Sequence, residues 1–245
     1  MKRIPQLIAL IASLGLPVAA IAEQPNTSGL AKHFRSVEGW KFVSSVEVHD
    51  SADTFSSTSG ASGNDEVLLN GDKFDRSIPY LYTANEFGDV SLRMEFTIPK
   101  NSNSGVYFMG RYEIQVYDSF GKENVDYSDL GGLYQRWIDD QSLPLEQRGY
   151  EGVAPNSNAS KAPGQWQTME VVFRAPRFDH AGKKIENAKF ISVKINGKLV
   201  HENIEAKGPT RAHPLKDEAS TGPIAIQGDH GPIAIRRFEV TPLTL

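Results

Sequence analysis

The chain has 245 residues, a formal net charge of −4 at neutral pH and no cysteine. The lack of cysteine excludes structural disulfides, thiolate metal sites and nucleophilic thiols. The acidic balance argues against nucleic acid as a partner, because phosphate binding needs a basic surface. A chain of this length can bury a sizeable core in one domain.

The N-terminus reads as a secretory signal peptide over residues 1–22. Lys2 and Arg3 precede an apolar run from Leu7 to Leu16, and Ala20-Ile21-Ala22 forms a small-x-small cleavage site. The apolar run is shorter than the roughly 20 residues that cross a bilayer. We therefore expect a periplasmic or secreted protein that has no membrane anchor after the signal is removed.

Alternation of apolar and polar residues dominates the remaining chain and predicts β-strands. The alternating or strand-like runs are residues 90–98, 105–117, 168–174, 191–195, 198–204, 223–227 and 232–243. Asn196-Gly197 separates two of these runs and predicts a type I′ hairpin turn. No helix longer than three turns is expected. Residues 23–245 thus predict a single all-β domain, a two-sheet antiparallel β-sandwich or jelly roll.

A long connection over residues 119–165 interrupts this rhythm. Connections of this length in a compact domain are usually functional or mobile. Tyr127, Tyr134 and Trp137 lie in it, and a solvated linker would not need such aromatic side chains. We expect this connection to roof a ligand-accessible hollow.

The strongest site signal is the strand that carries Arg111, Glu113 and Gln115, with Tyr107 and Tyr117 on either side. Residues two apart share one face of a strand, at a spacing of about 7 Å. Aromatic rings cover the apolar faces of a sugar, and the polar groups bind its hydroxyls. The alternative is a solvated outer face on which Arg111 and Glu113 form a surface ion pair.

The order Glu113-x-Gln115-x-x-Asp118 has the spacing of Glu-x-Asp-x-x-Glu, the acidic signature of jelly-roll glucanases. Gln115 stands in place of its aspartate, and Asp118 stands in place of its second glutamate. An offset of five places Glu113 and Asp118 on opposite faces of a strand unless a bulge intervenes. With a bulge, they could form the paired carboxyls of glycoside hydrolysis.

A second constellation is the C-terminal turn, which we define as Gln227-Gly228-Asp229-His230-Gly231. The flanking glycines make His230 accessible. Its imidazole could act as a general base or a metal ligand near neutral pH. The alternative is a turn histidine without a chemical role.

Several motifs together resemble a known family over about residues 80–243. The motifs are Gly88-Asp89-Val90-Ser91-Leu92, Asn103-Ser104-Gly105-Val106-Tyr107, Arg111-Tyr112-Glu113-Ile114-Gln115, Ala162-Pro163-Gly164-Gln165-Trp166, Val193-Lys194-Ile195-Asn196-Gly197 and Gly222-Pro223-Ile224 through His230-Gly231. In order and spacing, the chain resembles the 3-keto-disaccharide hydrolase domain, also described as a 3-keto-glucoside 1,2-lyase/hydratase domain.

This resemblance implies a concanavalin A-like sandwich that cleaves glycosides already oxidised at C3 by a separate sugar 3-dehydrogenase. It also implies that a divalent metal ion is a possible cofactor. In such a reaction a base removes the C2 proton, and a cation stabilises the enolate. We expect His230 or Glu113 as the base and Arg111 or a metal ion as the stabiliser. The side chains expected nearest the metal are those of Glu113, Asp118 and His230.

The carbohydrate ligand itself would be held by residues from the strand, the long connection and the C-terminal turn. These are Gln115, Tyr107, Tyr117, Tyr134, Gln227 and Asp229. Two other functions remain open at this point. One is a conventional glycosidase that uses Glu113 and Asp118, and the other is a non-catalytic, lectin-like carbohydrate-binding module.

Overall fold

The structure is a computed structural model that describes residues 29–49, 52–59 and 66–245. The predicted signal peptide, residues 1–22, lies outside the described residues. Over the part of the chain that is described, no helix has the length and apolar character needed to cross a membrane. Export to the periplasm or the medium stays a prediction.

The described elements are almost all strands, as the alternating sequence predicted. The strands are β1 (Lys41–Val43), β2 (Ser45–Glu47), β3 (Ser56–Thr58), β4 (Val67–Leu69), β5 (Leu81–Tyr82), β6 (Val90–Thr97), β7 (Asn103–Phe108), β8 (Tyr112–Tyr117), β9 (Arg136–Trp137), β10 (Gly149–Tyr150), β11 (Gln167–Arg174), β12 (Arg177–Phe178), β13 (Lys184–Glu186), β14 (Ala188–Ile195), β15 (Lys198–Ala206), β16 (Ala225–Ile226) and β17 (Ala234–Pro242). The helices are a short 3-10 turn, Ala31–His33, and α1 (Leu145–Arg148).

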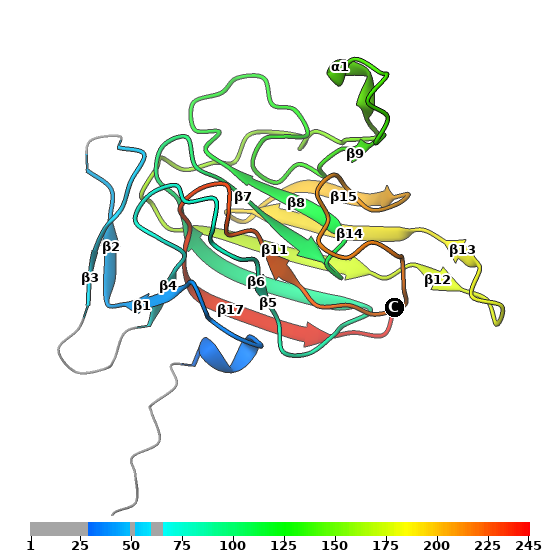
Figure 1. Ribbon diagram of the computed structural model, residues 1–245, viewed down its shortest axis with the longest axis horizontal. Helices are drawn as coiled ribbons and strands as arrows, with labels where there is room; N and C mark the ends of the chain where they lie inside the picture. The colour runs from blue at the N-terminus through cyan, green and yellow to red at the C-terminus, as the bar shows by residue number, and fades with distance from the viewer. Residues whose placement is uncertain (1–28, 50–51, 60–65) are drawn as a thin grey trace, which may run out of the picture.

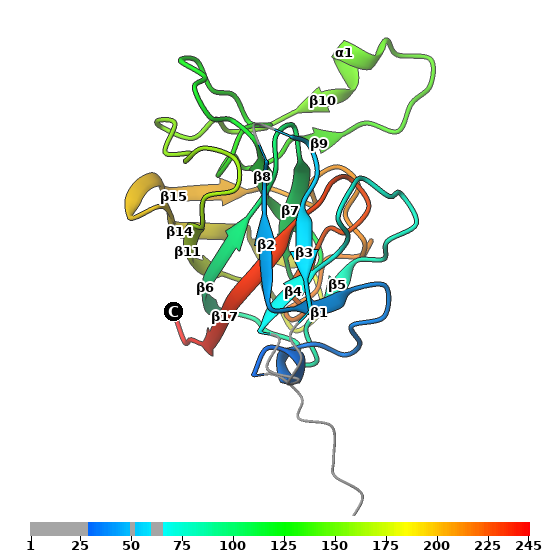
Figure 2. The same ribbon diagram turned by 90° about the vertical axis from the view of Figure 1, so that its left-hand side faces the viewer.

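Two antiparallel sheets form the body of the molecule (Figure 1). The large sheet has the strand order β1-β4-β17-β6-β11-β14-β15, and the small sheet has the order β5-β16-β7-β8. Three two-stranded ribbons, β2–β3, β9–β10 and β12–β13, are attached to them. The two sheets lie on opposite sides of the core when the molecule is seen along its length (Figure 2). The expected two-sheet sandwich is confirmed.

The core lies between the two sheets because each strand turns alternate side chains inward. On β6 the apolar residues of the predicted alternation are buried, while Ser91, Arg93 and Glu95 face outward or are only partly buried. Phe108 of the small sheet packs against Phe173 and Phe190 of the large sheet, with ring centroids 5.2 and 5.3 Å apart. These aromatic contacts hold the sheets together directly behind the pocket described below.

The predicted run over residues 105–117 is two strands rather than one. β7 and β8 form a hairpin whose turn residues, Met109 and Gly110, have φ values of 56° and 64°. Two successive positive φ values are typical of the type I′ turn, whose twist matches that of paired strands. The hairpin places Tyr107 directly opposite Glu113. Arg111 lies beside the turn, before the strand begins.

The long connection first extends the small sheet. The backbone N–H of Tyr134 donates to the carbonyl of Glu113 at 3.1 Å, and the N–H of Gln115 donates to the carbonyl of Gly132 at 2.9 Å. Residues 131–134 therefore run beside β8 and bring Tyr134 to the same face as Glu113. The following arm, which we define as residues 136–150, carries β9, α1 and β10.

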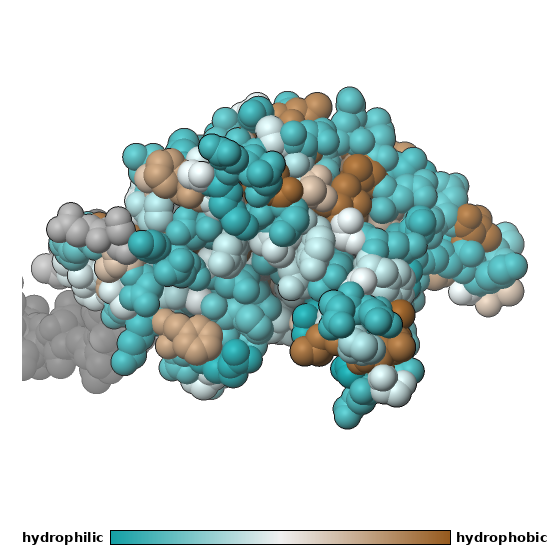
Figure 3. Space-filling model, turned by 90° about the horizontal axis from the view of Figure 1, so that it is seen from above, coloured by the Kyte–Doolittle hydropathy of each residue, from teal (hydrophilic) through white to brown (hydrophobic). Residues whose placement is uncertain are grey.

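The arm projects from one end of the molecule and leans toward the side of the small sheet (Figure 2). It exposes Ile138 and Leu145. Seen from above, the surface is mostly hydrophilic, and its hydrophobic patches are small and separate (Figure 3).

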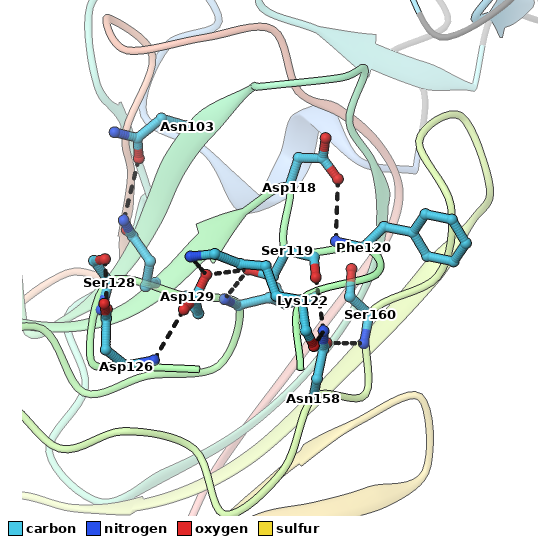
Figure 4. A network of polar contacts seen from close by, with 12 residues as sticks. Asn103, Asp118, Ser119, Phe120, Lys122, Asp126, Ser128, Asp129, Asn158 and Ser160 are labelled. Atoms are coloured by element: carbon cyan, nitrogen blue, oxygen red, sulfur yellow. Dashed lines mark hydrogen bonds and ion pairs between the residues drawn. The ribbon is translucent and has the colours of Figure 1, made fainter. Parts of the chain in front are cut away.

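Asp129 fixes the start of the long connection (Figure 4). Its buried carboxylate accepts hydrogen bonds from Ser119 Oγ and Lys122 Nζ, both at 2.7 Å, and from the backbone N–H of Asp126 at 2.9 Å. These charge-assisted bonds satisfy the buried carboxylate and hold the pKa of Asp129 below its usual range against the cost of burial. These hydrogen bonds therefore hold the first turn of the long connection in one defined conformation.

Asn70, at the end of β4, fixes the C-terminal turn. Its buried amide nitrogen donates to the carbonyls of Gly228 and Gly231, both at 2.8 Å, and its oxygen accepts from the N–H of Ile233 at 2.7 Å. One side chain thus satisfies three backbone groups that the turn leaves unpaired. This contact determines where Asp229 and His230 lie.

We expect Asn70→Ala to lower the free energy of unfolding by about 2–4 kcal/mol, because it leaves several buried backbone groups without partners. Denaturant unfolding would measure the difference. The matched control is Asn124→Ala, since Asn124 is exposed in the long connection. Equal stabilities for both variants and the wild type would contradict this role of Asn70.

Candidate functional site

A polar pocket of about 210 Å³ opens on the outer face of the small sheet. It is lined by Asn103, Tyr107, Glu113, Gln115, Tyr134, Arg211, Ala212, Gln227 and His230. Residues from the β7–β8 hairpin, the long connection and the C-terminal turn meet here. Six of the ten residues singled out from the sequence line this pocket, namely Tyr107, Glu113, Gln115, Tyr134, Gln227 and His230.

Glu113 forms the floor of the pocket with 2% of its surface exposed. Its carboxyl group lies over Gly105 of β7, where a side chain of any size would collide with it. Burial raises the pKa of Glu113 to about 8, although a hydrogen bond from Tyr107 favours the charged form. A carboxyl group with this pKa exchanges its proton near neutral pH, as a general acid or base must.

Two neutral tyrosines support the carboxyl group. Burial, the charge of Glu113 and the hydrogen bond to it raise the pKa of Tyr107 well above its usual range. The ring of Tyr80 lies 5.7 Å from that of Tyr107, and burial raises the pKa of Tyr80 to about 12. The amide nitrogen of Gln227 donates to the hydroxyl of Tyr80 at 3.0 Å. Both phenols therefore stay protonated and act as hydrogen-bond donors at neutral pH.

His230 forms a pair with its neighbour Asp229. Its Nδ1 lies 2.6 Å from Asp229 Oδ1, and both side chains are partly exposed. The carboxylate fixes the proton on Nδ1 in the neutral ring, which leaves Nε2 free to contact a ligand. Asp229 thus orients the imidazole and does not itself line the pocket.

Arg211 supplies the positive charge of the pocket, and sequence reasoning missed it. It follows Thr210, whose backbone N–H donates to the carbonyl of Arg111 at 2.9 Å. The guanidinium of Arg211 lies 3.7 Å from the centroid of the Trp137 ring. Burial and the charge of Glu113 raise the pKa of Tyr134, while the charge of Arg211 opposes this shift. No local motif marks Arg211, because it lies in a loop about 100 residues after Glu113 in the sequence.

Arg111 is not brought into the pocket. Its guanidinium donates to the backbone carbonyls of Met109 at 2.7 Å and Asp217 at 2.5 Å. These bonds hold the β7–β8 turn against the loop that contains Asp217. The expectation that Arg111, Glu113 and Gln115 share one ligand face is therefore corrected for Arg111, because the hairpin turn redirects its side chain.

Asp118 and Tyr117 also lie outside the pocket lining. Asp118 accepts a hydrogen bond from the backbone N–H of Asn101 at 3.0 Å. It accepts another from the backbone N–H of Phe120 at 3.3 Å (Figure 4). The register of β7 with β8 contains no bulge that would turn Asp118 toward Glu113. The ring of Tyr117 lies beside Lys122. The paired-carboxyl arrangement required by a conventional glycosidase is therefore not assembled from Glu113 and Asp118.

The expected metal site is likewise not assembled from its three candidate ligands. Glu113 and His230 line the pocket, but Asp118 is engaged elsewhere, and no group of three acidic, histidine or cysteine side chains comes together in the described residues. The donors present do not fit such an ion, and we derive no step through one.

A larger hollow of about 640 Å³ lies near residues 85–89 and 242–245. It contains one acidic group deep in its wall, Asp89, whose carboxylate is already bound by Arg177 at 2.6 and 2.8 Å. Arg177 and two backbone N–H groups hold the pKa of Asp89 below its usual range. The hollow therefore offers a satisfied ion pair, whereas the smaller pocket offers a proton-exchanging carboxyl group.

The profile of the 3-keto-alpha-glucoside-1,2-lyase-like domain matches residues 33–241. The match begins well before the sequence motifs noted above, which start near residue 80. No curated protein matches the chain.

Two solved structures described as candidate glycosyl hydrolases from Parabacteroides distasonis are similar to the chain. The first has a TM-score of 0.56 and 22% sequence identity, and the alignment covers 73% of this chain and 72% of that one. The second has a TM-score of 0.48 and 14% identity, with 84% and 90% coverage. At 22% identity, the likeness to the first structure supports the fold alone.

The buried carboxyl group predicts a pH-dependent difference in stability. The pKa of Glu113 rises from an ordinary value of 4.5 to about 8 in the fold. The neutral form is thus favoured in the folded state, and stability is lost as pH rises from about 4.5 to 8. Glu113→Gln removes this loss, so its gain in Tm over the wild type should grow across that range and level off above it.

Thermal unfolding at several pH values would measure this gain. The matched control is Glu202→Gln, because Glu202 is exposed on β15. A Tm difference for Glu113→Gln that does not change with pH, or one that Glu202→Gln reproduces, would contradict the raised pKa.

Proposed function

Because the chain belongs to the family of 3-keto-alpha-glucoside-1,2-lyase-like domains, we propose that it cleaves glycosides whose sugar ring carries a ketone at C3. The observation that carries the proposal is the buried carboxyl group of Glu113, with a pKa of about 8, in a pocket that also contains Arg211 and His230. Such a ketone acidifies the neighbouring C2 proton, so the reaction needs one well-placed base rather than two opposed carboxyls.

Glu113 is the proposed base. In its ionised form the carboxylate takes the proton from C2, and the electrons of the C–H bond form an enolate whose charge lies on the C3 oxygen. Burial destabilises the charge of Glu113 and so strengthens it as a base, and the hydrogen bond from Tyr107 offsets only part of this effect. The acid form of Glu113 can return the proton at a later step.

Arg211 is the proposed partner of the enolate. It is the cationic side chain in the pocket lining, and developing negative charge on the C3 oxygen would be attracted to it. The Trp137 ring beneath the guanidinium limits the positions that it can adopt. This role replaces the one expected for Arg111, whose guanidinium is occupied by backbone carbonyls.

His230 is the proposed acid for the leaving group. When the enolate collapses, a double bond forms between C1 and C2, and the bond from C1 to the glycosidic oxygen breaks. His230 in its protonated form donates a proton from Nε2 to that oxygen, and Asp229 orients the ring through its contact with Nδ1. The products are an unsaturated 3-keto sugar and the free alcohol, and water can later add to the double bond.

The substrate ketone has to come from an earlier reaction. Oxidation of a C3 hydroxyl is a hydride transfer, which requires an oxidised cofactor and a separate oxidoreductase. We therefore propose that a separate sugar 3-dehydrogenase supplies the keto-glycoside.

The direct test compares the wild type with Glu113→Gln on a 3-keto-glucoside and on 3-keto-trehalose. We expect Glu113→Gln to lower kcat by at least about 100-fold, because general base catalysis typically contributes 10²–10⁴-fold. Glu202→Gln, the control on β15, should keep wild-type turnover. Equal rates for Glu113→Gln and the wild type would remove Glu113 from the mechanism.

The same assay separates the rival functions. Cleavage of unoxidised glucosides at a comparable rate would favour a conventional glycosidase. Sugar binding with no product from any keto-glycoside would favour a lectin-like module. Either result would overturn the proposed reaction.

The pH profile offers a second check on the base. Since Glu113 acts in its ionised form and His230 in its protonated form, the profile of kcat/KM against pH for the wild type should be bell-shaped, with one limb at an apparent pKa of about 8. A profile with no inflection near pH 8 would contradict the raised pKa of the base.

Arg211→Met tests the enolate partner. Loss of one stabilising donor costs about 10²–10³-fold in kcat at comparable sites, and KM should change much less. The control is Arg76→Met, because Arg76 is exposed and is not among the residues that line the pocket. A variant that loses only substrate affinity would show that Arg211 binds the ground state and not the enolate.

A further inference from the structure

One polar atom in the pocket has no partner within the protein. Gln115 has 3% of its surface exposed, and its side-chain oxygen Oε1 makes no hydrogen bond in the described structure. A buried amide oxygen without a donor costs roughly 1–3 kcal/mol, so such groups are rare in native folds. The unpaired oxygen therefore belongs to a residue that lines the pocket.

The other end of the amide is held in place. Gln115 Nε2 donates to Asn103 Oδ1 at 3.3 Å, and Asn103 also lines the pocket. The backbone N–H of Gln115 donates to the carbonyl of Gly132, and its carbonyl accepts from the N–H of Gly131, both at 2.9 Å. The side chain is therefore anchored through its nitrogen, and its oxygen is the free end.

The neighbouring residues do not provide the missing donor. Gly105 faces Gln115 across the β7–β8 pair and has no side chain. Glu113 lies over Gly105, and its side chain forms its hydrogen bond with Tyr107 rather than with Gln115. The donor for Gln115 Oε1 must then come from a molecule that enters the pocket.

We propose that Gln115 selects the substrate by requiring a hydroxyl group that donates to its side-chain oxygen. The inference rests on the proposed function for the identity of the ring, a 3-keto sugar, and adds a demand on its substituents. A site built to pair with a hydroxyl rejects an analogue that lacks it, because the protein group is then left buried and unpaired. Gln115 is thus a specificity-determining residue next to the base.

The test is a cycle that removes the protein group and the sugar hydroxyl separately and together. The substrates are a 3-keto-glucoside and its 2-, 4- and 6-deoxy analogues. The variant is Gln115→Met, which keeps the side-chain length and removes the amide. For the wild type, one deoxy position should lower kcat/KM by about 10- to 100-fold. For Gln115→Met, the same deletion should lower it by less than about threefold.

Two controls keep the outcome interpretable. Gln141→Met changes an exposed glutamine in the arm and should discriminate among the analogues as the wild type does. Asn103→Ala releases the amide nitrogen of Gln115 and should weaken the discrimination without removing it. If Gln115→Met loses its fold, as judged by circular dichroism, Asn103→Ala carries the test alone.

A Gln115→Met variant that discriminates among the analogues as the wild type does would overturn the inference. So would a wild type that accepts every deoxy analogue equally. Failure of the proposed function is seen separately, as no turnover of any keto-glycoside by the wild type. In that case, calorimetry would measure the binding of glucose and its deoxy analogues to the wild type and to Gln115→Met. The variant is then expected to discriminate among these sugars less than the wild type does.

Discussion

The site depends on the burial of one carboxyl group, that of Glu113 on β8, against the neighbouring strand β7 of the hairpin. Glu113 lies over Gly105 and against Tyr107, with almost no contact with solvent. A carboxyl group removed from water favours its neutral form, and this is why the pKa of Glu113 reaches about 8. The fold bears this cost in stability above pH 4.5, and strained or costly groups of this kind concentrate at functional sites.

The rest of the fold maintains that arrangement from a distance. Aromatic packing of Phe108 against the large sheet fixes β7 from behind. Asn70 anchors the turn that carries His230, and Asp129 anchors the start of the connection that carries Tyr134. Three segments far apart in the sequence thus converge on one carboxyl group, and each is fixed by a buried polar side chain or by the core.

The sequence predicted the strands well because half-buried strands leave a two-residue periodicity. It predicted β6, β11, β14 and β15 and the Asn196-Gly197 turn, whose φ values are 52° and 79°. It missed the turn at Met109-Gly110 because apolar and polar residues continue to alternate through it. That error placed Arg111 beside Glu113. The place of Arg211 in the pocket could not be predicted from the sequence for another reason. It depends on tertiary contacts between a loop and the small sheet.

The most direct measurement is the titration of the Glu113 carboxyl group itself. Protein labelled with carbon-13 at the glutamate side-chain carboxyl would be followed by NMR from pH 4 to 10, and Glu113→Gln would identify the resonance. The structure predicts that this one glutamate titrates near 8, far above its ordinary value of 4.5. A Glu113 resonance that titrates below 5 would show a solvated carboxylate and would contradict the account.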